Sequence, residues 1–559
     1  MIMMNNITMN KIQFINMKSV IKGYFFRWIG MSGFFMTVFT ICIPAFADQQ
    51  SGDQARELAM ALVNALVEQG LLSREKAGEL MQQAQARALL QNKKSEQLID
   101  PLSLKIAPAT SIPSVPSAHV QYVPEIVKQQ LREDIRNEVI AQAHKEGWAT
   151  PGAVPEWVDH FSWEGDMRLR FQGEQFGKNN STNIKNYQAI NLAGTEAINN
   201  PFLYTDGAGN VSPERDRLML RARLGTSINV TKDVDIKLRL STSINTDPIS
   251  SNQTLGSYGG RYQMQLDRAW MHWRVNDHVD FWGGRIANPF LSTELIWAPD
   301  LGFDGVAMRY QKSLSNTVAP YALVGLFPLQ ELANSNHDKW LFGAQVGSEW
   351  TPGDSHLRWG LAWYGYQNVT GMRNDTDLHI NDNSAPTYLQ KGNTLYNIRV
   401  SSTDPASALY ALAGNYRLLD MTATADVPVQ GGKYVFLSAD WVRNIGWNTD
   451  AVKARSGFNV DSQTTGYFLK LGLGDLQPSK QGDWQLFGSY RYLGADAVLD
   501  AFTDTEFHLG GTNAKGYILG GTYAVKDNSL LTLRWLSSDE ITGPPLAIDI
   551  LQVDMNLKF

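Results

Sequence analysis

AIDILQVDMNLKF, residues Ala547–Phe559, is the end of the chain and decides how the rest of it is interpreted. From Leu551 onward, apolar and polar residues alternate strictly up to the aromatic carboxyl terminus. Such alternation is typical of a β-strand with one apolar and one polar face. Because soluble antiparallel sheets alternate in the same way, this stretch alone fits either a soluble sandwich or a membrane barrel.

The same alternation recurs through residues 160–559 and predicts about 16 antiparallel strands. In the first of them, apolar Trp163, Met167, Leu169 and Phe171 alternate with charged residues. Most of the strands have the roughly 9–11 residues that cross a bilayer at a tilt. They are predicted near residues 163–171, 217–228, 234–240, 264–274, 278–286, 302–311, 316–326, 339–350, 355–366, 415–427, 432–443, 464–474, 483–493, 513–524, 529–537 and 547–559.

The gaps between these strands alternate between short and long. Short gaps rich in turn residues, such as Thr351–Asp354, follow the even-numbered strands, and long gaps such as 367–414 follow the odd-numbered ones. Outer-membrane barrels have short periplasmic turns and longer outer loops, whereas a soluble sandwich has no reason to sort its connections in this way. We therefore predict an all-β transmembrane barrel over residues 160–559, closed by pairing of its last strand with its first.

The amino terminus has the features of an exported protein. Lys18, Lys22 and Arg27 precede an apolar run at 29–43, and small residues follow at 45–47. This order is typical of a signal peptide, which we place at residues 1–47. The single cysteine, Cys42, lies in the apolar run, so a cleaved chain would have no disulfide and no thiol nucleophile.

Three segments are predicted between the signal peptide and the barrel. Helical periodicity indicates a small α-helical, coiled-coil-like periplasmic segment at 48–100 and a further helix with a lead-in to the barrel at 125–159. The Pro- and Ser-rich stretch at 101–124 is a linker. The helices could oligomerise the protein, plug a pore, contact the cell wall or serve as a spacer, and the sequence leaves these roles open.

The polar face of the strands would line the lumen if the apolar face meets lipid. The basic residues assigned to it are Arg168, Arg170, Arg217, Arg221, Arg223, Lys237, Arg239, Arg268, Arg274, Arg309, Arg358, Lys470, Arg491, Lys515, Arg534 and Lys558. The acidic residues assigned to it are fewer: Glu164, Asp166, Asp235, Glu349, Asp440 and Asp554. A basic lumen favours anions; the alternative is that the arginines pair with acidic loop residues and only brace the wall. We predict as pore-lining residues Arg168, Arg170, Arg217, Arg221, Arg223, Arg239 and Arg268.

Three stretches carry a resemblance to a known family. They are GRIANPF at Gly284–Phe290, WAPDLGFDGVAMRY at Trp297–Tyr310, and the passage EGW…PEWVDHFSWEGDMRLRF that ends at Phe171. Together they resemble the Gram-negative "putative porin" family. The resemblance implies an outer-membrane pore with a helical N-terminal periplasmic part, and it implies no particular solute.

Two expectations about sites follow from this resemblance. In general porins the third loop folds into the lumen and narrows it, and by analogy residues 286–301 would form the constriction. A terminal Phe resembles the C-terminal signature of outer-membrane proteins, so Phe559 is expected to be an assembly signal read by the barrel assembly machinery. The constriction residues that we predict are Arg285, Asn288, Pro289, Phe290, Trp297 and Asp300.

Motifs of enzymatic chemistry are absent from the sequence. The histidines at 272, 337, 356, 379 and 508 are isolated, and none lies in a G-x-S-x-G or H-E-x-x-H context. The acidic stretch at 375–383 offers oxygen ligands for calcium, or is simply a solvated polar loop. We expect no enzyme, no cofactor, no metal site and no nucleic-acid partner.

The sequence thus predicts an outer-membrane porin through which small hydrophilic solutes diffuse passively, with a preference for anions if the lumen is basic. Two alternatives are an outer-membrane adhesin or envelope-tethering barrel, and a barrel enzyme. The expected partners are outer-membrane lipid, the barrel assembly machinery and small hydrophilic solutes. A homotrimer, and a cell-wall contact through the N-terminal helices, are left open.

Overall fold

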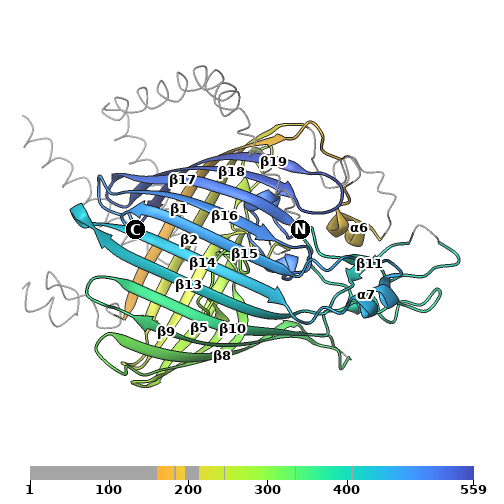
Figure 1. Cartoon of the computed structure of the whole chain (residues 1–559), viewed down its shortest axis with the longest axis horizontal. Helices are drawn as coiled ribbons and strands as arrows, with labels where there is room; N and C mark the ends of the chain where they lie inside the picture. The colour runs from red at the N-terminus through yellow and green to blue at the C-terminus, as the bar shows by residue number, and fades with distance from the viewer. Residues whose placement is uncertain (1–159, 182–183, 195–212, 245, 334, 405–406) are drawn as a thin grey trace, which may run out of the picture. The chain divides into compact units, whose positions relative to one another are not determined.

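The structure, a computed structural model, describes residues 160–559 except 182–183, 195–212, 245, 334 and 405–406. The predicted signal peptide, helical segments and linker lie outside the described residues. In the described part, a 17-stranded sheet forms the body of the protein, and β4 (Gln253–Thr254) is a two-residue strand within a loop of that sheet. The other strands form the wall of a closed antiparallel barrel (Figure 1).

The strands of the wall correspond one to one to the predicted strands, so the predicted fold is confirmed. They are β1 (Phe161–Phe176), β2 (Arg215–Asn229), β3 (Val234–Thr242), β5 (Met264–Asn276), β6 (Val279–Ile286), β7 (Phe303–Gln311), β8 (Val318–Gln330), β9 (Lys339–Trp350), β10 (His356–Gln367), β13 (Arg417–Val429), β14 (Lys433–Asn444), β15 (Thr465–Gly474), β16 (Trp484–Leu493), β17 (Ala514–Lys526), β18 (Ser529–Glu540) and β19 (Ala547–Lys558).

The barrel closes where the first strand meets the last. β1 pairs with β2 on one side and with β19 on the other, in an antiparallel register that runs from Asp166 opposite Lys558 to Phe176 opposite Ile548. The seam extends to the end of the chain: the Gly165 amide donates to the Phe559 carbonyl, and the Phe559 amide donates to the Gly165 carbonyl, both at 3.1 Å. The predicted pairing of the final strand with the first is therefore confirmed.

Long and short connections lie at opposite ends of the barrel. The C-terminus marks one end, and α6 (Tyr187–Ala193), α7 (Thr449–Ser456) and β11 (Leu395–Asn397) lie at the other (Figure 1). β11 pairs with β12 (Tyr410–Leu412) in a small separate sheet, and four single-turn 3₁₀ helices occur at Asp382–Ser384, Gln430–Gly432, Asp500–Phe502 and Phe507–Leu509. The sequence predicted the long gaps but not these small elements, because tertiary contacts rather than periodicity stabilise them.

The two faces of the wall differ in what they contact. On β15, Leu471 points outward and is 56 % exposed, whereas Phe468 points inward and is 2 % exposed. A large exposed leucine is costly in water but favourable against lipid, so the outer face is suited to a membrane. Among the described residues, no helix has the length and apolar character needed to cross a membrane.

The seam gives a test of the assembly role of Phe559. A Cβ added at Gly165 would lie 2.4 Å from Cζ of the Phe559 ring and 2.9 Å from the backbone carbonyl of Arg223, so Gly165→Ala must displace the terminal ring and strain the pairing with β2. We expect a cost of about 1–3 kcal/mol, as for other overpacked sites, and a smaller folded fraction in the outer membrane. The measurement is the fraction of the protein that runs as the folded, heat-modifiable band when the gel sample is not heated.

The matched control is Gly488→Ala, in which the added methyl meets only Cδ2 of Leu519, at 3.2 Å. This flexible side chain can move aside, so assembly should stay at the wild-type level. Deleting Phe559 should reproduce the defect of Gly165→Ala. Wild-type assembly of both the Gly165 variant and the truncated chain would refute a role for this contact.

Candidate functional site in the barrel lumen

The connection between β6 and β7, residues 287–302, lies inside the barrel. Phe290 and Trp297 are 6 % and 2 % exposed, and both pack onto the inward-facing ring of Tyr364 on β10, with ring centroids 5.1 and 5.3 Å away. Phe290 also meets Phe327 of β8, edge to face, at 6.2 Å. Aromatic contacts of this kind each add about 0.5–1.5 kcal/mol to the gain from burial. The loop is thereby anchored to one side of the lumen.

Polar side chains of the wall satisfy the backbone of this loop. Gln345 of β9 accepts a hydrogen bond from the Leu291 amide at 2.9 Å and donates one to the Leu291 carbonyl at 2.8 Å. Asp440 of β14 accepts from the Thr293 amide at 3.2 Å and from the Thr293 hydroxyl at 2.7 Å. Backbone groups removed from water need such partners, so these contacts hold the loop in place.

The far end of the loop reaches an arginine-rich wall. Asp300 lies 3.1 Å from Arg223 and 3.9 Å from Arg221, both on β2, and also accepts a hydrogen bond from the Ser251 hydroxyl at 2.9 Å. The loop thus crosses the lumen, from β9 and β14 at one end to β2 at the other. This geometry places the carboxylate of a predicted constriction residue beside two predicted pore-lining residues.

A second loop, residues 494–513 between β16 and β17, also lies inside the barrel. Its Phe502 carbonyl accepts a hydrogen bond from the Ala298 amide at 2.8 Å, so it contacts the first loop. Its Glu506 pairs with Arg170 and Arg534 and lies 3.8 Å from Arg168. This second inward loop could not be predicted from the sequence, because its contacts join residues far apart in the chain.

The predicted pore-lining arginines gather on adjacent strands, β1, β2, β3 and β5, and most of them are paired. Arg170 donates two hydrogen bonds to Asp554, at 2.6 and 2.7 Å, and Arg239 donates to Asp267 at 2.6 Å. The remaining pairs are Arg217 with Glu174, and Arg221 and Arg223 with Asp166. Removing one partner of a buried pair costs about 3–5 kcal/mol, so these pairs brace the wall.

Arg268 and Arg168 differ from the other arginines. Among the described residues, Arg268 has no ion-pair partner, and its buried Nε has no hydrogen-bond partner. Arg168 donates to the neutral amide oxygen of Asn252, and its Nε also has no partner. Its carboxylate neighbour, Glu506, is 3.8 Å away and is shared with Arg170 and Arg534. Positive charge on this wall is therefore incompletely neutralised at these two side chains.

One predicted constriction residue, Arg285, lies elsewhere than expected. Arg285 lies within β6, on the strand face opposite buried Ile286, and pairs at 2.9 Å with Asp304, whose side chain is 57 % exposed. Arg285 is therefore on the outer face rather than in the constriction. Asn288, by contrast, is a local cap, which accepts from the Phe290 amide at 3.0 Å and donates to the Ser292 hydroxyl at 2.8 Å. Half-buried Pro289 lies between these residues.

One predicted inward residue, Lys515, faces lipid. It shares its face of β17 with Tyr517, which is 50 % exposed, whereas Ala514 and Ile518 are buried on the inner face. The assignment was wrong because β17 carries apolar residues on both faces, so alternation did not identify the inner one.

One acidic wall residue, Asp420, was not recognised from the sequence. Asp420 of β13 and Asp440 of β14 are 0 % and 3 % exposed and lie diagonally on the inner face of neighbouring strands, because Asp440 is opposite Thr422, two residues from Asp420. Asp440 was predicted to face inward but Asp420 was not. The preceding inward residue, Leu418, is apolar because it packs against the inward loops, so the polar side of β13 could not be recognised.

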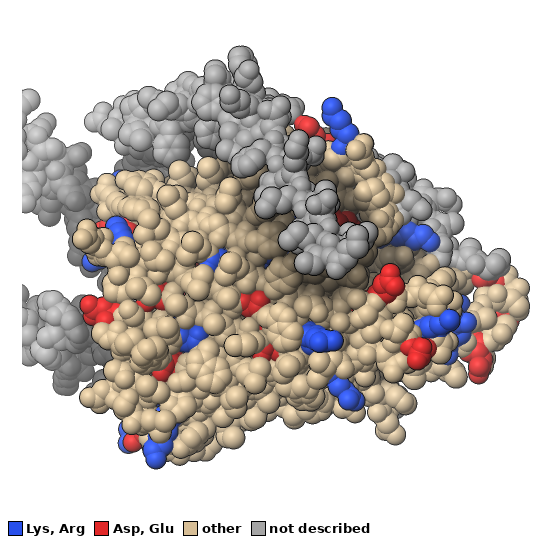
Figure 2. Space-filling model, in the orientation of Figure 1, with Lys and Arg blue, Asp and Glu red and all other residues tan. Residues whose placement is uncertain are grey.

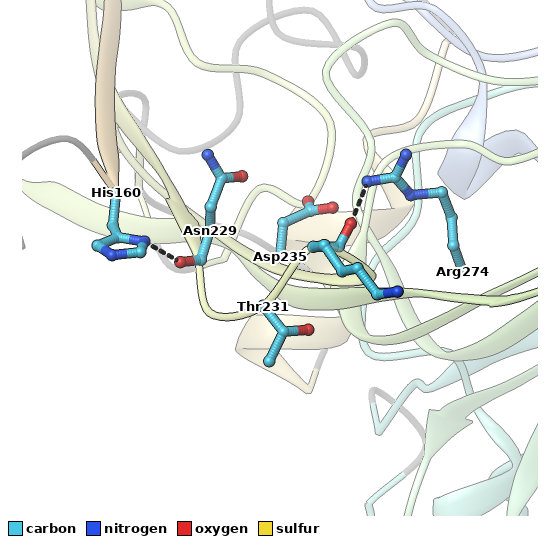
Figure 3. Close-up of a pocket in the computed structure, with 6 residues that line it drawn as sticks. His160, Asn229, Thr231, Asp235 and Arg274 are labelled. Carbon is cyan, nitrogen blue, oxygen red and sulfur yellow. Dashed lines mark hydrogen bonds between the residues drawn. The ribbon is translucent and has the colours of Figure 1, made fainter.

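A shallow pocket of about 390 Å³ lies at the short-turn rim of the barrel (Figure 3). His160 points at the Asn229 carbonyl, with Nδ1 2.8 Å from the oxygen, and Arg274 donates to the Lys232 carbonyl at 2.8 Å. These contacts brace the turn between β2 and β3. Across the described part of the chain, no three His, Cys, Asp or Glu side chains gather closely enough to hold a metal ion.

The closed wall, apolar outside and charged inside, defines a transmembrane β-barrel of the channel-forming class. The chain belongs to the family described as "Putative porin", whose model matches residues 56–559. Family and fold together indicate an outer-membrane channel rather than an enzyme. A comparison with curated proteins finds no match.

Several solved structures show a weak similarity to this chain. OprB of Pseudomonas putida at high pH is 12 % identical with a TM-score of 0.42, and the match covers 73 % of this chain and 96 % of OprB. The outer membrane channel DcaP of Acinetobacter baumannii is 11 % identical with a TM-score of 0.36, and the match covers 71 % of this chain and 97 % of DcaP. Salmonella typhi OmpF, in complex with daunomycin, is 11 % identical with a TM-score of 0.37, and the match covers 71 % of this chain and 97 % of OmpF. These values are too low to transfer any detail of function.

The anchoring of the first loop can be tested at Asp300. Asp300→Ala removes the carboxylate that ties the loop to Arg221 and Arg223 and leaves both arginines to share Asp166. We expect noisier and larger single-channel currents in planar bilayers, because the loop end is released. The control is Asp304→Ala, which breaks the exposed pair with Arg285 on the outer face. Equal currents from wild type and Asp300→Ala would show that this ion pair does not hold the loop.

The second loop is expected to loosen in acid. His508 is fully buried, with its ring nitrogens 2.9 Å from the Ser538 hydroxyl and 2.8 Å from Glu540. Burial lowers the pKa of His508 to about 4, with a contribution from nearby Lys391 that the Glu540 hydrogen bond opposes. The ordinary histidine pKa is about 6.5, so His508 binds a proton more readily when the loop is unfolded than when it is folded. The stability of the folded loop therefore falls as the pH drops from about 6.5 to about 4.

The measurement is thiol labelling of Ala497→Cys, a buried position of the same loop, in a Cys42→Ala background. Labelling is expressed relative to urea-unfolded protein at each pH, which removes the intrinsic pH dependence of the thiol. Relative labelling should rise between pH of about 7 and about 5, and His508→Gln should flatten that rise. A rise of equal size in the His508→Gln protein would exclude this histidine as the cause.

Proposed function

We propose that the barrel is a passive diffusion channel for small hydrophilic solutes and that it prefers anions. The observation that carries the proposal is the arginine-rich wall of β1, β2, β3 and β5, which lies opposite the apolar anchoring site of the first loop. Between them, solutes would pass charged side chains on one side and loop backbone on the other. Filtering would then depend on the width of the gap and on the unpaired charge beside it.

The anion preference should be weaker than the basic residues alone would suggest. Asp166, Asp300 and Glu506 neutralise much of the wall. The remaining surplus is at Arg268 and Arg168. A unit charge about 8 Å from an ion in water changes its energy by about 0.5 kcal/mol, or roughly twofold in local concentration.

Reversal potentials in a salt gradient test this proposal. Purified wild-type protein should pass ions in steps, with a moderate excess of chloride over potassium. Arg268→Gln should reduce that ratio roughly twofold, because it removes the least-neutralised charge of the wall. Arg443→Gln, which changes an arginine on the outer face, should leave the ratio unchanged. Absence of ion steps would refute the channel, and a cation-selective wild type would refute the anion preference.

Solute flux should agree with the ion measurements. In liposome swelling assays, a small anionic solute should enter faster than a neutral solute of the same size, and Arg268→Gln should narrow the difference. The homotrimer, the barrel assembly machinery, the cell-wall contact and the cleaved signal peptide remain predictions from the sequence.

A further inference from the structure

Two arginines on the outer face of the barrel lack the carboxylate partners that lumenal arginines have. Arg417 and Arg443 lie near the loop ends of β13 and β14, and both are exposed. On the outer face Arg443 is opposite Leu419, and Arg417 is bonded through its carbonyl to the amide of Ile445. Among the described residues, no Asp or Glu lies within ion-pair distance of either guanidinium.

An aromatic row lies directly below these arginines on the same face. Trp441 is opposite Tyr467, and Tyr467 is opposite Tyr492, whose ring is stacked on it at 5.0 Å with the planes 5° apart. Tyr490 and Tyr517 extend the aromatic surface across β16 and β17. Outward aromatic rings of this kind mark the interface between hydrocarbon and headgroups.

The length of β14 places the arginines at the outer interface. Its 12 residues rise about 40 Å along the strand, or about 30 Å along the barrel axis at a tilt near 40°, which is the thickness of the hydrocarbon core. Lys433, at one end of this strand, is on the short-turn side, and Arg443 is on the long-loop side. Arg443 and Arg417 therefore lie at the level of the outer-leaflet headgroups.

Open space adjoins Arg417 on its loop side. On β10 the position opposite Arg417 is Gly365, and the Trp363 ring covers it, 2.4 Å from where a Cβ would lie. Arg417 also lines a cavity of about 430 Å³ together with Asn415, Asn368 and Arg455, and Arg455 donates to the Ala413 carbonyl at 2.8 and 3.0 Å. The wall seen in Figure 2 is mostly uncharged, with small blue and red patches scattered over it.

We propose that Arg417 and Arg443 bind the phosphate groups of a phosphorylated glycolipid in the outer leaflet. The guanidinium groups match phosphate oxygens in geometry and charge, and the aromatic row supports the upper part of the acyl chains. Lys515 continues the aromatic row, but Asp539 is opposite it on β18, so the two arginines supply the specificity. A lipid bound here would cover the boundary between the wall and the outer loops.

The test uses the full chain in detergent with purified lipopolysaccharide as the probe. Wild-type protein should bind it more tightly than the same lipid with its phosphates removed. The double variant Arg417→Gln, Arg443→Gln should weaken binding by about tenfold, as expected for the loss of charge-assisted contacts. Lys312→Gln, at an exposed position of the β7–β8 turn on the opposite rim, should bind like wild type.

Heat-modifiable folding and single-channel conductance of the double variant should equal those of wild type, which separates a lost lipid site from a misfolded barrel. Unchanged lipid affinity in the folded double variant would overturn the proposal, as would equal binding of the phosphate-free lipid. Inorganic diphosphate would also overturn the proposal if it displaced the lipid from wild-type protein at the same molar concentration as unlabelled lipid does. The arginines would then bind a free anion rather than a lipid.

Discussion

The hydrogen-bonded seam between β1 and β19 is the constraint on which the rest of the structure depends. In a bilayer an unpaired strand edge exposes amide and carbonyl groups that lipid cannot satisfy, each at a cost of several kcal/mol. Pairing continues to the terminal residue, where Gly165 exchanges two hydrogen bonds with Phe559. Gly165 also leaves space for the Phe559 ring, so the requirement for closure extends to the choice of a residue without a side chain. Closure then fixes which face of every strand is inside.

Once the wall is closed, its interior must solve a second problem, because two loops fold into it and exclude water from part of the wall. Arginines covered by loop residues would be costly without partners. The loops themselves supply carboxylates, Asp300 from one and Glu506 from the other, while Asp166 and Asp554 come from the wall. The charge of the lumen is therefore a property of wall and loops together. This coupling makes the position of each loop sensitive to the charge that it neutralises.

The strands of the wall could be predicted from the sequence because lipid imposes an apolar outer face on every one of them. β1 and β2 also have a strongly polar inner face, so their inward arginines were identified correctly from alternation alone. The inner face of β8, β10 and β13 carries Phe327, Tyr364 and Leu418, which pack against inward loops, and there the alternation is lost.

The ion pairs of the lumen could not be predicted for a different reason. Arg170 and Glu506 are 336 residues apart, and no local pattern links them. The 494–513 loop was recognised only as a gap, since a loop that is buried by tertiary contacts has the same composition as one in solvent. Arg285 was placed in the constriction because its motif resembles that of a family, and the register of β6 turned its side chain outward.

Arginine appears on both faces of this barrel, and its partner decides what it does. In the lumen, Arg170 makes a bidentate contact with Asp554 and is 1 % exposed, so it has little capacity left for a solute and mainly holds the wall. Arg443 on the outer face is exposed at the level where water and headgroups mix, and it needs no internal carboxylate to remain charged. Composition alone treats these two residues as equivalent. The placement of carboxylates, rather than that of arginines, therefore separates the side chains that stabilise this barrel from those free to contact a ligand.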